Sequence, residues 1–205
     1  MAGTNLLKIA SWNCNGLKRK KEFIAELCND LDIVALQETL LMSHDLNETE
    51  NIHRDFKCFS KSSVDSNIEI LTGRPYGGLS FMWHNSLDRF INIINYASDR
   101  LLGLCLKLDN CKILLLNVYL PYQDTHLRNF DHYVQILGEI QSIVHESDAD
   151  HFCILGDLNA HPTRVFFNEL SQFSQTNSLT ISDIELLPDD TYTYVKQRRE
   201  NITIS

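Results

Sequence analysis

Short hydrophobic segments separated by polar stretches recur along the chain and predict a core built largely of β-strands. Each segment has the length of a strand, and 113–116 is apolar at every position, as in a sheet covered on both faces. The polar pair Asp109 and Asn110 separates two of the segments and predicts a hairpin. The six segments are 7–12, 33–36, 79–83, 101–108, 113–120 and 152–155.

Two other segments carry hydrophobic residues at helical spacing. One is short and follows the basic run 18–21, which predicts a surface helix through Phe23, Ile24 and Leu27. The other, 125–147, predicts a longer helix that covers one sheet, because its apolar residues form a single stripe. That stripe consists of Phe130, Val134, Leu137 and Val144. Strands alternating with helices, together with a hairpin, predict a layered α/β sandwich.

The rest of the chain predicts one domain over residues 1–205. Residues 43–72 are polar and weakly patterned, which predicts a long irregular loop of the kind that is often functional. A chain of 205 residues with 43% hydrophobic content can bury one sizeable core. No run reaches the roughly 18 apolar residues of a membrane helix, and the first residues do not resemble a signal peptide. We therefore expect an intracellular protein with no membrane partner.

Cysteine content and net charge narrow the function further. No two of the six cysteines stand at the two-residue spacing of zinc ribbons and redox motifs, so we expect them to be reduced. A formal net charge of -9 argues against a high-affinity nucleic-acid-binding module, whose affinity comes mainly from Lys and Arg. The charge is compatible with a nuclease in which a bound metal supplies the positive charge.

The strongest chemical signal follows the last hydrophobic segment. Gly156 ends that segment and is followed by Asp157 and Asn159. A carboxylate here can orient and deprotonate a water, and an amide can donate to a phosphate oxygen. Taken alone, the same residues are equally typical of a turn after a strand.

Three more predicted strands end in polar residues. Asn13 and Asn15 follow the first segment, Glu38 follows the second, and Asn117 and Tyr119 lie at the end of a later one. Ligands of layered α/β proteins gather where strand ends converge. If these ends meet at one rim, the sequence predicts a single polar cleft.

The order of these motifs resembles the endonuclease/exonuclease/phosphatase superfamily. From Trp12 to Asn159 the chain carries W-N-x-N-G, L-Q-E, G-G, N-x-Y-x-P and G-D-x-N in that family's order. Residues 12–17, 74–79 and 156–161 are most similar to the endonuclease domains of non-LTR retrotransposons. The resemblance implies two packed mixed β-sheets flanked by helices.

The resemblance also implies a metal site. Glu38 would be the main ligand of Mg²⁺ or Mn²⁺, a hard cation that takes oxygen ligands and keeps several waters. Asn15 stands where many members carry Asp, so it would bind the metal only as a neutral amide or through water. Asn13 would belong to the same shell and to the substrate-binding set.

The remaining implied roles concern the substrate. Asp157 would orient or activate the attacking water, and Asn159 would bind the scissile phosphate. Tyr119 would hydrogen-bond the phosphate or the nucleophile, and Asn117 would also belong to the substrate-binding set. For His161 a structural or surface role is favoured, although retrotransposon members often have His at this point.

Family members continue with a T-[FY] element, an S-x-x-D strand and an S-D-H segment. Thr191 and Tyr192 match the first of these, but no Asp or His follows before Ser205. We therefore expect a C-terminally incomplete domain that lacks the last strands and has reduced activity.

Three functions stay open from the sequence. The first is a DNA-nicking endonuclease of a retroelement, which would act in the nucleus. The second is a phosphatase or exonuclease of the same fold, acting on a lipid, nucleotide or RNA phosphate. The third is a catalytically inactive binding module, against which the intact Glu38, Tyr119, Asp157 and Asn159 argue. DNA is the expected partner, and the sequence does not predict an oligomeric state.

Overall fold

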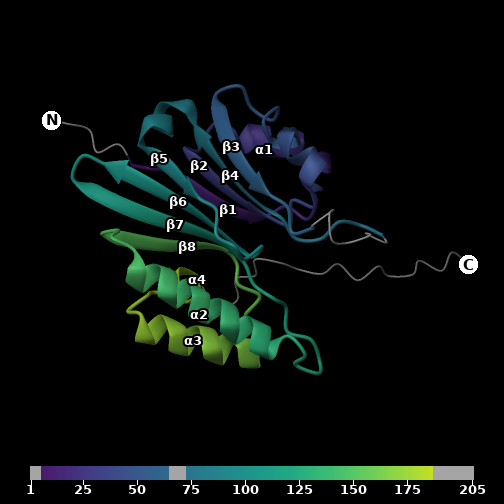
Figure 1. Cartoon of the computed structure of the whole chain (residues 1–205), viewed down its shortest axis with the longest axis vertical. Coiled ribbons are helices and arrows are strands. Elements are labelled where there is room, and N and C mark those ends of the chain that lie inside the picture. The colour runs from purple at the N-terminus through teal and green to yellow at the C-terminus, as the bar shows by residue number, and fades with distance from the viewer. Residues whose placement is uncertain (1–5, 65–72, 187–205) are drawn as a thin grey trace, which may run out of the picture.

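Two β-sheets pack face to face in the computed structural model, with helices on their outer faces (Figure 1). The structure describes residues 6–64 and 73–186, and within these ranges each sheet has four strands. The first sheet has the order β1-β2-β4-β3 and consists of β1 (Ile9–Asn13), β2 (Ile33–Gln37), β4 (Leu79–His84) and β3 (Phe56–Lys61). The second has the order β5-β6-β7-β8 and consists of β5 (Ile91–Ile94), β6 (Leu101–Leu108), β7 (Cys111–Tyr119) and β8 (His151–Asp157).

Both sheets are mixed, as the sequence analysis predicted. The pairs β1 with β2 and β7 with β8 are parallel, and the other neighbouring strands are antiparallel. In each parallel pair the carboxyl ends come together, with Asn13 opposite Gln37 and Tyr119 opposite Asp157. Those ends are where the polar motifs of the sequence lie.

The core between the sheets explains why several strands are apolar on both faces. Ile33 and Ala35 of β2 pack toward the second sheet, while Val34 and Leu36 pack outward in a different hydrophobic cluster. Every residue of β2 is buried. Burial of both faces removes the alternation of polar and apolar residues that a one-sided strand shows.

Helices cover the outer faces of both sheets (Figure 1). The first sheet is covered by α1 (Lys21–Cys28) and the 3-10 helix η2 (Ser43–Thr49). The second is covered by α2 (Phe130–Glu146) and α3 (Val165–Thr176). The remaining helices are short: η1 (Leu17–Arg19), η3 (Asn85–Phe90) and α4 (Ser182–Leu186).

The structure confirms all six predicted strands and adds two that the pattern did not reveal. The predicted hairpin is present, with Leu108 opposite Cys111. The interpretation of 43–72 as a loop was wrong for its first part, which contains η2 and β3, whereas residues 65–72 lie outside the described ranges. β3 and β5 are edge strands, and their sequences carry the Lys, Ser and Asn residues that such exposed positions tolerate.

The buried stripe of α2 differs from the predicted one. Its buried residues are Tyr133, Ile136, Leu137 and Ile140. Val134, predicted to face the core, is 39% exposed, so that prediction was wrong. Two overlapping series at helical spacing exist in this segment, and packing against the sheet selects the one that contains Tyr133, whose hydroxyl donates to the carbonyl of Leu158 at 3.1 Å.

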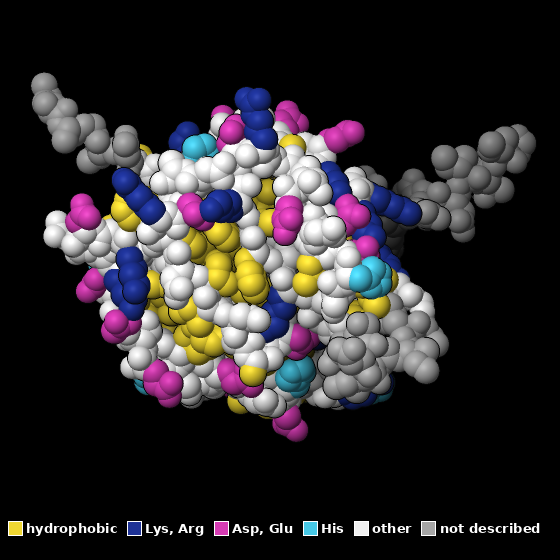
Figure 2. Space-filling view, turned by 45° about the horizontal axis from the view of Figure 1, so that its top comes forward, with side chains coloured by type: hydrophobic (Ala, Val, Ile, Leu, Met, Phe, Trp, Pro, Cys, Tyr) yellow, Lys and Arg dark blue, Asp and Glu magenta, His cyan; other side chains and the backbone are white. Residues whose placement is uncertain are grey.

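The surface mixes charges of both signs. On the face shown in Figure 2, acidic and basic side chains surround a group of hydrophobic side chains near the middle. None of the helices within the described ranges is long and apolar enough to cross a membrane. All six cysteines are free in the structure.

Candidate active site

Three strand ends from both sheets meet at the amide of Asn13. Asn13 is the last residue of β1, Glu38 follows β2, and Asp157 is the last residue of β8. The Nδ2 atom of Asn13 donates to Glu38 Oε1 at 3.0 Å and to Asp157 Oδ2 at 2.8 Å. One uncharged side chain therefore holds two carboxylates that are far apart in the sequence.

The backbone bends sharply just after these strands. Asn15, Glu38 and Asn159 have φ angles of 45°, 51° and 48°, in the left-handed region that non-glycine residues seldom adopt. The N–H of Gly16 donates to the carbonyl of Glu38 at 2.8 Å, which ties the first two bends together. Such conformations persist where surrounding contacts fix them, and they cluster at functional sites.

Tyr119 adds a protonated phenol to the two carboxylates. Its hydroxyl hydrogen-bonds Glu38, and burial, followed by this bond, raises the pKa of Tyr119 well above its ordinary value. The guanidinium carbon of Arg100 lies 4.9 Å from the centre of the Tyr119 ring, and Nη1 donates to the Tyr119 carbonyl at 3.3 Å. The phenol is thus a fixed hydrogen-bond donor at neutral pH.

Asn159 hydrogen-bonds both Asp157 and the residue that follows β7. Its backbone N–H donates to Asp157 Oδ1 at 3.1 Å, and its Nδ2 donates to the carbonyl of Leu120 at 2.7 Å. An amide nitrogen carries two hydrogens, so one N–H of Asn159 remains for a substrate oxygen.

Asn117 lies beneath the site, not in it. It is fully buried, and its Oδ1 accepts from Gln37 Nε2 at 2.7 Å. Its Nδ2 donates to the carbonyls of Leu36 and Ser80 at 3.1 and 2.9 Å. We therefore correct its predicted role: the Asn117 amide is used up in joining the two sheets and does not reach a substrate.

The side chain of Asn15 binds Arg74 and not the two carboxylates. Asn15 is exposed, and its Oδ1 accepts a hydrogen bond from Arg74 Nη2 at 2.9 Å. The same nitrogen donates to the Asn15 carbonyl at 3.0 Å. Binding of a metal by this amide oxygen would require Arg74 to move.

The oxygen atoms at the site suit a cation that keeps most of its waters. In the described part of the chain, no cluster of three or more His, Cys, Asp and Glu side chains could hold a metal. The site offers two carboxylates, Glu38 and Asp157, which both accept from the amide of Asn13. Mg²⁺ commonly binds through one or two carboxylates and several waters, so this donor set fits it.

Sequence reasoning missed two supporting residues, Gln37 and Arg100. Gln37 is 1% exposed, and besides Asn117 its Nε2 lies 3.2 Å from Ser11 Oγ. Its signal in the sequence was an amide at the end of an otherwise apolar strand. Arg100 gave no signal of its role in the sequence, and the structure places its guanidinium over the Tyr119 ring.

Two other predicted features lie away from the carboxylates. His161 is exposed and forms a local turn, with its Nδ1 3.0 Å from Thr163 Oγ1. This geometry agrees with the structural role favoured from the sequence. The T-[FY] match at Thr191 and Tyr192 lies outside the described residues.

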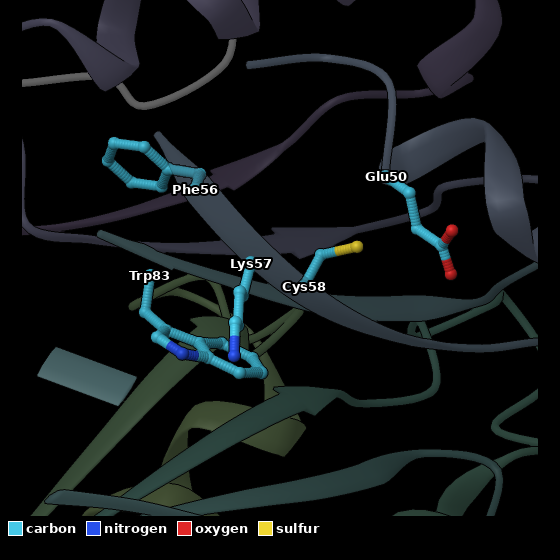
Figure 3. Close-up of a pocket in the computed structure, with 5 residues that line it drawn as sticks. All are labelled: Glu50, Phe56, Lys57, Cys58 and Trp83. Atoms are coloured by element: carbon cyan, nitrogen blue, oxygen red, sulfur yellow. The ribbon is translucent and has the colours of Figure 1, made fainter. Parts of the chain in front are cut away.

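A hollow lies at the end of the first sheet that is remote from Glu38. It has a volume of about 270 Å³ and is lined by Glu50, Phe56, Lys57, Cys58 and Trp83. Figure 3 shows these side chains pointing in different directions around β3. Phe56 is opposite His84, whereas the end of β4 near Glu38 is Leu79, so this hollow does not belong to the site.

The sequence model of the Endonuclease/Exonuclease/phosphatase family matches residues 10–199. Curated proteins give no match.

Solved structures with the same fold include three nucleic-acid enzymes. The AP endonuclease LMAP from Leishmania major is 16% identical, with a TM-score of 0.61 over 83% of this chain and 66% of that one. The endonuclease domain of TRAS1, a telomere-specific non-LTR retrotransposon, is 12% identical, with a TM-score of 0.57 over 83% and 72%. The 3' phosphatase NExo from Neisseria, bound to product DNA hairpin, is 16% identical, with a TM-score of 0.58 over 82% and 71%. The chain thus spans just under two thirds of the Leishmania protein.

Proposed function

Because the chain belongs to the endonuclease/exonuclease/phosphatase family, we propose that it hydrolyses phosphodiester bonds in DNA with a divalent metal ion. The observation that carries the proposal is the amide of Asn13, which holds Glu38 and Asp157 together at the ends of strands from both sheets. Two carboxylates beside a protonated phenol match what phosphoryl transfer needs, namely a positioned nucleophile and stabilised phosphate charge.

Asp157 is proposed to orient and deprotonate the attacking water. Its Oδ2 accepts from Asn13 and its Oδ1 from the backbone of Asn159, so the carboxylate is held in one orientation. A carboxylate keeps lone pairs for a water after accepting two such bonds. This fixed orientation is what general base catalysis requires.

Glu38 is proposed to hold the metal, Mg²⁺ or Mn²⁺. When bound, such a cation supplies Lewis-acid stabilisation of charge on the phosphate. Glu38 accepts hydrogen bonds from Asn13 and Tyr119, which orient the carboxylate before any ligand arrives. We propose Asn15 only as an outer ligand, because Arg74 already contacts its amide oxygen.

Asn159 is proposed to donate to an oxygen of the scissile phosphate, and Tyr119 to do so when a ligand of Glu38 releases its single hydroxyl proton from the bond to Glu38. The raised pKa of Tyr119 keeps the hydroxyl proton in place through neutral pH. The second amide N–H of Asn159 remains available, since only one bond is made to Leu120. Fixed donors aimed at developing negative charge are typically the largest contribution to such catalysis.

We further propose a nicking endonuclease of the retroelement type that acts in the nucleus, on the basis of the motif order described above. The test is nicking of supercoiled plasmid in Mg²⁺. Glu38→Ala and Asp157→Ala should each reduce the rate by about 100-fold or more. Asp109→Ala, which alters an exposed carboxylate in the β6–β7 turn, is the matched control and should nick normally.

Other outcomes would replace this proposal. Release of single nucleotides from the ends of linear DNA, without nicking, would indicate an exonuclease. Release of phosphate from 3' ends alone would indicate a phosphatase. Absence of both cleavage and Glu38-dependent metal binding would favour a binding module.

A further inference from the structure

A hollow of about 370 Å³ adjoins the candidate active site. Its walls are the turn after β1, the turn after β2 and Arg74. Arg74 packs closely against the first turn: its Nη2 lies 3.0 Å from the Asn15 carbonyl, and an added Cβ on Gly16 would lie 3.3 Å from the same nitrogen. Contacts between Arg74 and the turn after β1, which are distant in the sequence, therefore form this wall of the hollow.

The hollow adjoins the turn that carries Asn15 and the turn that carries Glu38. The N–H of Asn15 donates to Asn13 Oδ1 at 3.1 Å, so the wall of the hollow begins next to the bridging amide. Thr39 and Leu40 in the opposite wall directly follow Glu38. Consecutive Cα atoms are about 3.8 Å apart, which places the second wall within about 8 Å of the Glu38 backbone.

The charge of the lining is opposite to that of the chain as a whole. Three of the residues that line the hollow are cations, Lys18, Arg19 and Arg74, and none is an acid, although the net charge of the chain is -9. On the face in Figure 2, by contrast, acids and bases are interspersed.

Two of these three cations have no acidic partner among the residues that the structure describes. Lys18 Nζ pairs with Asp45 Oδ2 at 2.9 Å. Within residues 6–64 and 73–186, neither Arg19 nor Arg74 forms an ion pair, and the partners of Arg74 are the uncharged oxygens of Asn15. A guanidinium has five N–H donors, and the described contacts of Arg74 to Asn15 use its Nη2 alone.

We propose that this hollow binds a second phosphate of a nucleic-acid strand whose scissile phosphate lies at Glu38 and Asp157. The inference rests on the proposed function and adds to it the site that would hold a phosphate beside the scissile one. Because the second wall begins at the residue after Glu38, the hollow lies next to the scissile position and suits a neighbouring phosphate of the same strand. Arginine is suited to such contacts because its planar fork matches phosphate oxygens.

The test measures binding without cleavage. A fluorescently labelled single-stranded oligonucleotide is titrated with the protein in EDTA at low salt, and anisotropy gives the dissociation constant. Arg19→Ala and Arg74→Ala should each weaken binding about tenfold and lower the slope of log affinity against log salt by about 0.7. Arg54→Ala, an exposed arginine (91% of the side chain) before β3, is the matched control and should bind as the parent does.

The results distinguish a phosphate of a nucleic-acid strand from a single free phosphate and from no ligand. Unchanged binding in both variants, an equal loss in the control, or no binding by the parent protein overturns the proposal. Competition by a nucleoside monophosphate as effective as competition by the unlabelled oligonucleotide would show a site for a single phosphate and also overturn it.

A separate assay isolates the proposed function. Metal-dependent hydrolysis of bis(p-nitrophenyl) phosphate, which has no second phosphate, is measured on the parent protein. Absence of that hydrolysis with arginine-dependent binding intact would remove the proposed function and leave the subsite. Hydrolysis without arginine-dependent binding would do the reverse.

Discussion

Asn13 shows how uncharged residues position the acids of the candidate site. Its amide donates to both Glu38 and Asp157, while its Oδ1 accepts from the N–H of Asn15. The two carboxylates would otherwise repel each other, and a shared donor offsets that repulsion. Tyr119 acts in the same way on Glu38 alone.

Metal binding should depend on Glu38 much more than on Asn15. Glu38→Gln removes a charged oxygen ligand, so we expect Mn²⁺ affinity to fall at least about 100-fold. Asn15→Ala should change it less than about threefold, because the amide oxygen is already paired with Arg74. Isothermal titration calorimetry checks both. A loss in Asn15→Ala equal to that in Glu38→Gln would mean that Arg74 moves and the amide binds the metal.

Tyr133 should make the protein less stable at alkaline pH. Burial raises its pKa above the ordinary value of 10.0, so above about pH 10 the unfolded chain loses this proton while the folded chain keeps it. The stabilising contribution is complete below pH 10 and is lost as pH rises toward the folded-state pKa. Urea unfolding of Tyr133→Phe should therefore show a smaller drop in unfolding free energy between pH 9 and pH 11 than the parent.

The same variant has a second effect and a matched control. At pH 8, Tyr133→Phe should lose about 1 kcal/mol with its bond to Leu158. Tyr122→Phe, at a position 61% exposed, should leave both the stability and its pH dependence unchanged. Identical pH profiles for the parent and Tyr133→Phe would contradict the assignment.

Among the elements, β8 depends on a glycine to bring Asp157 to the site. Gly156 has a φ of 137°, and a Cβ at this position would overlap the carbonyl oxygen of Val118 in β7. Val118 is its direct partner across the parallel pair. The close approach of the two backbones sets the positions of Tyr119 and Asp157, which follow.

Gly156→Ala should destabilise the protein by about 3 kcal/mol or more, because both the overlap and the positive φ oppose a side chain. Gly138→Ala is the matched control, since Gly138 lies on the exposed side of α2 with no atom within 4 Å of an added Cβ. That change should stabilise the protein by about 0.5 to 1 kcal/mol. Urea unfolding measures both, and equal effects would show that the backbone of β8 is not constrained at Gly156.

In the whole molecule, a buried amide pair joins the two sheets behind the site. Gln37 ends β2 in the first sheet and Asn117 lies in β7 of the second. Their side-chain bond of 2.7 Å and the bonds from Asn117 to Leu36 and Ser80 cross the hydrophobic interface. The pair fixes how the carboxyl ends of the two sheets meet.

Asn117→Ala should cost about 2 to 4 kcal/mol, because it removes three buried hydrogen bonds, to Gln37 and to the carbonyls of Leu36 and Ser80. Gln37→Leu in the same background should recover part of this loss, since both polar partners are then gone. Thermal unfolding of the two single variants and the double variant forms the required cycle. Additive losses would show that the two amides act independently.

The sequence by itself determined six of the eight described strands and the polar residues at their ends. These follow from local patterns, because hydrophobic runs, turn residues and short motifs each involve neighbours in the chain. For this reason β6 could be predicted to the residue, and Asn13, Glu38, Tyr119, Asp157 and Asn159 could be singled out. Edge strands β3 and β5 escaped because partial exposure weakens their pattern.

Only the tertiary structure decided which of these polar residues contact one another. The bonds from Asn13 join residues 25 and 144 positions apart, and their geometry depends on strand register and on how the sheets pack. The same packing buried Asn117, turned Val134 outward and brought Arg74 to Asn15. Contacts between distant residues are set by the whole fold, so no local pattern could have distinguished the amide that bridges the carboxylates from the one that supports the core.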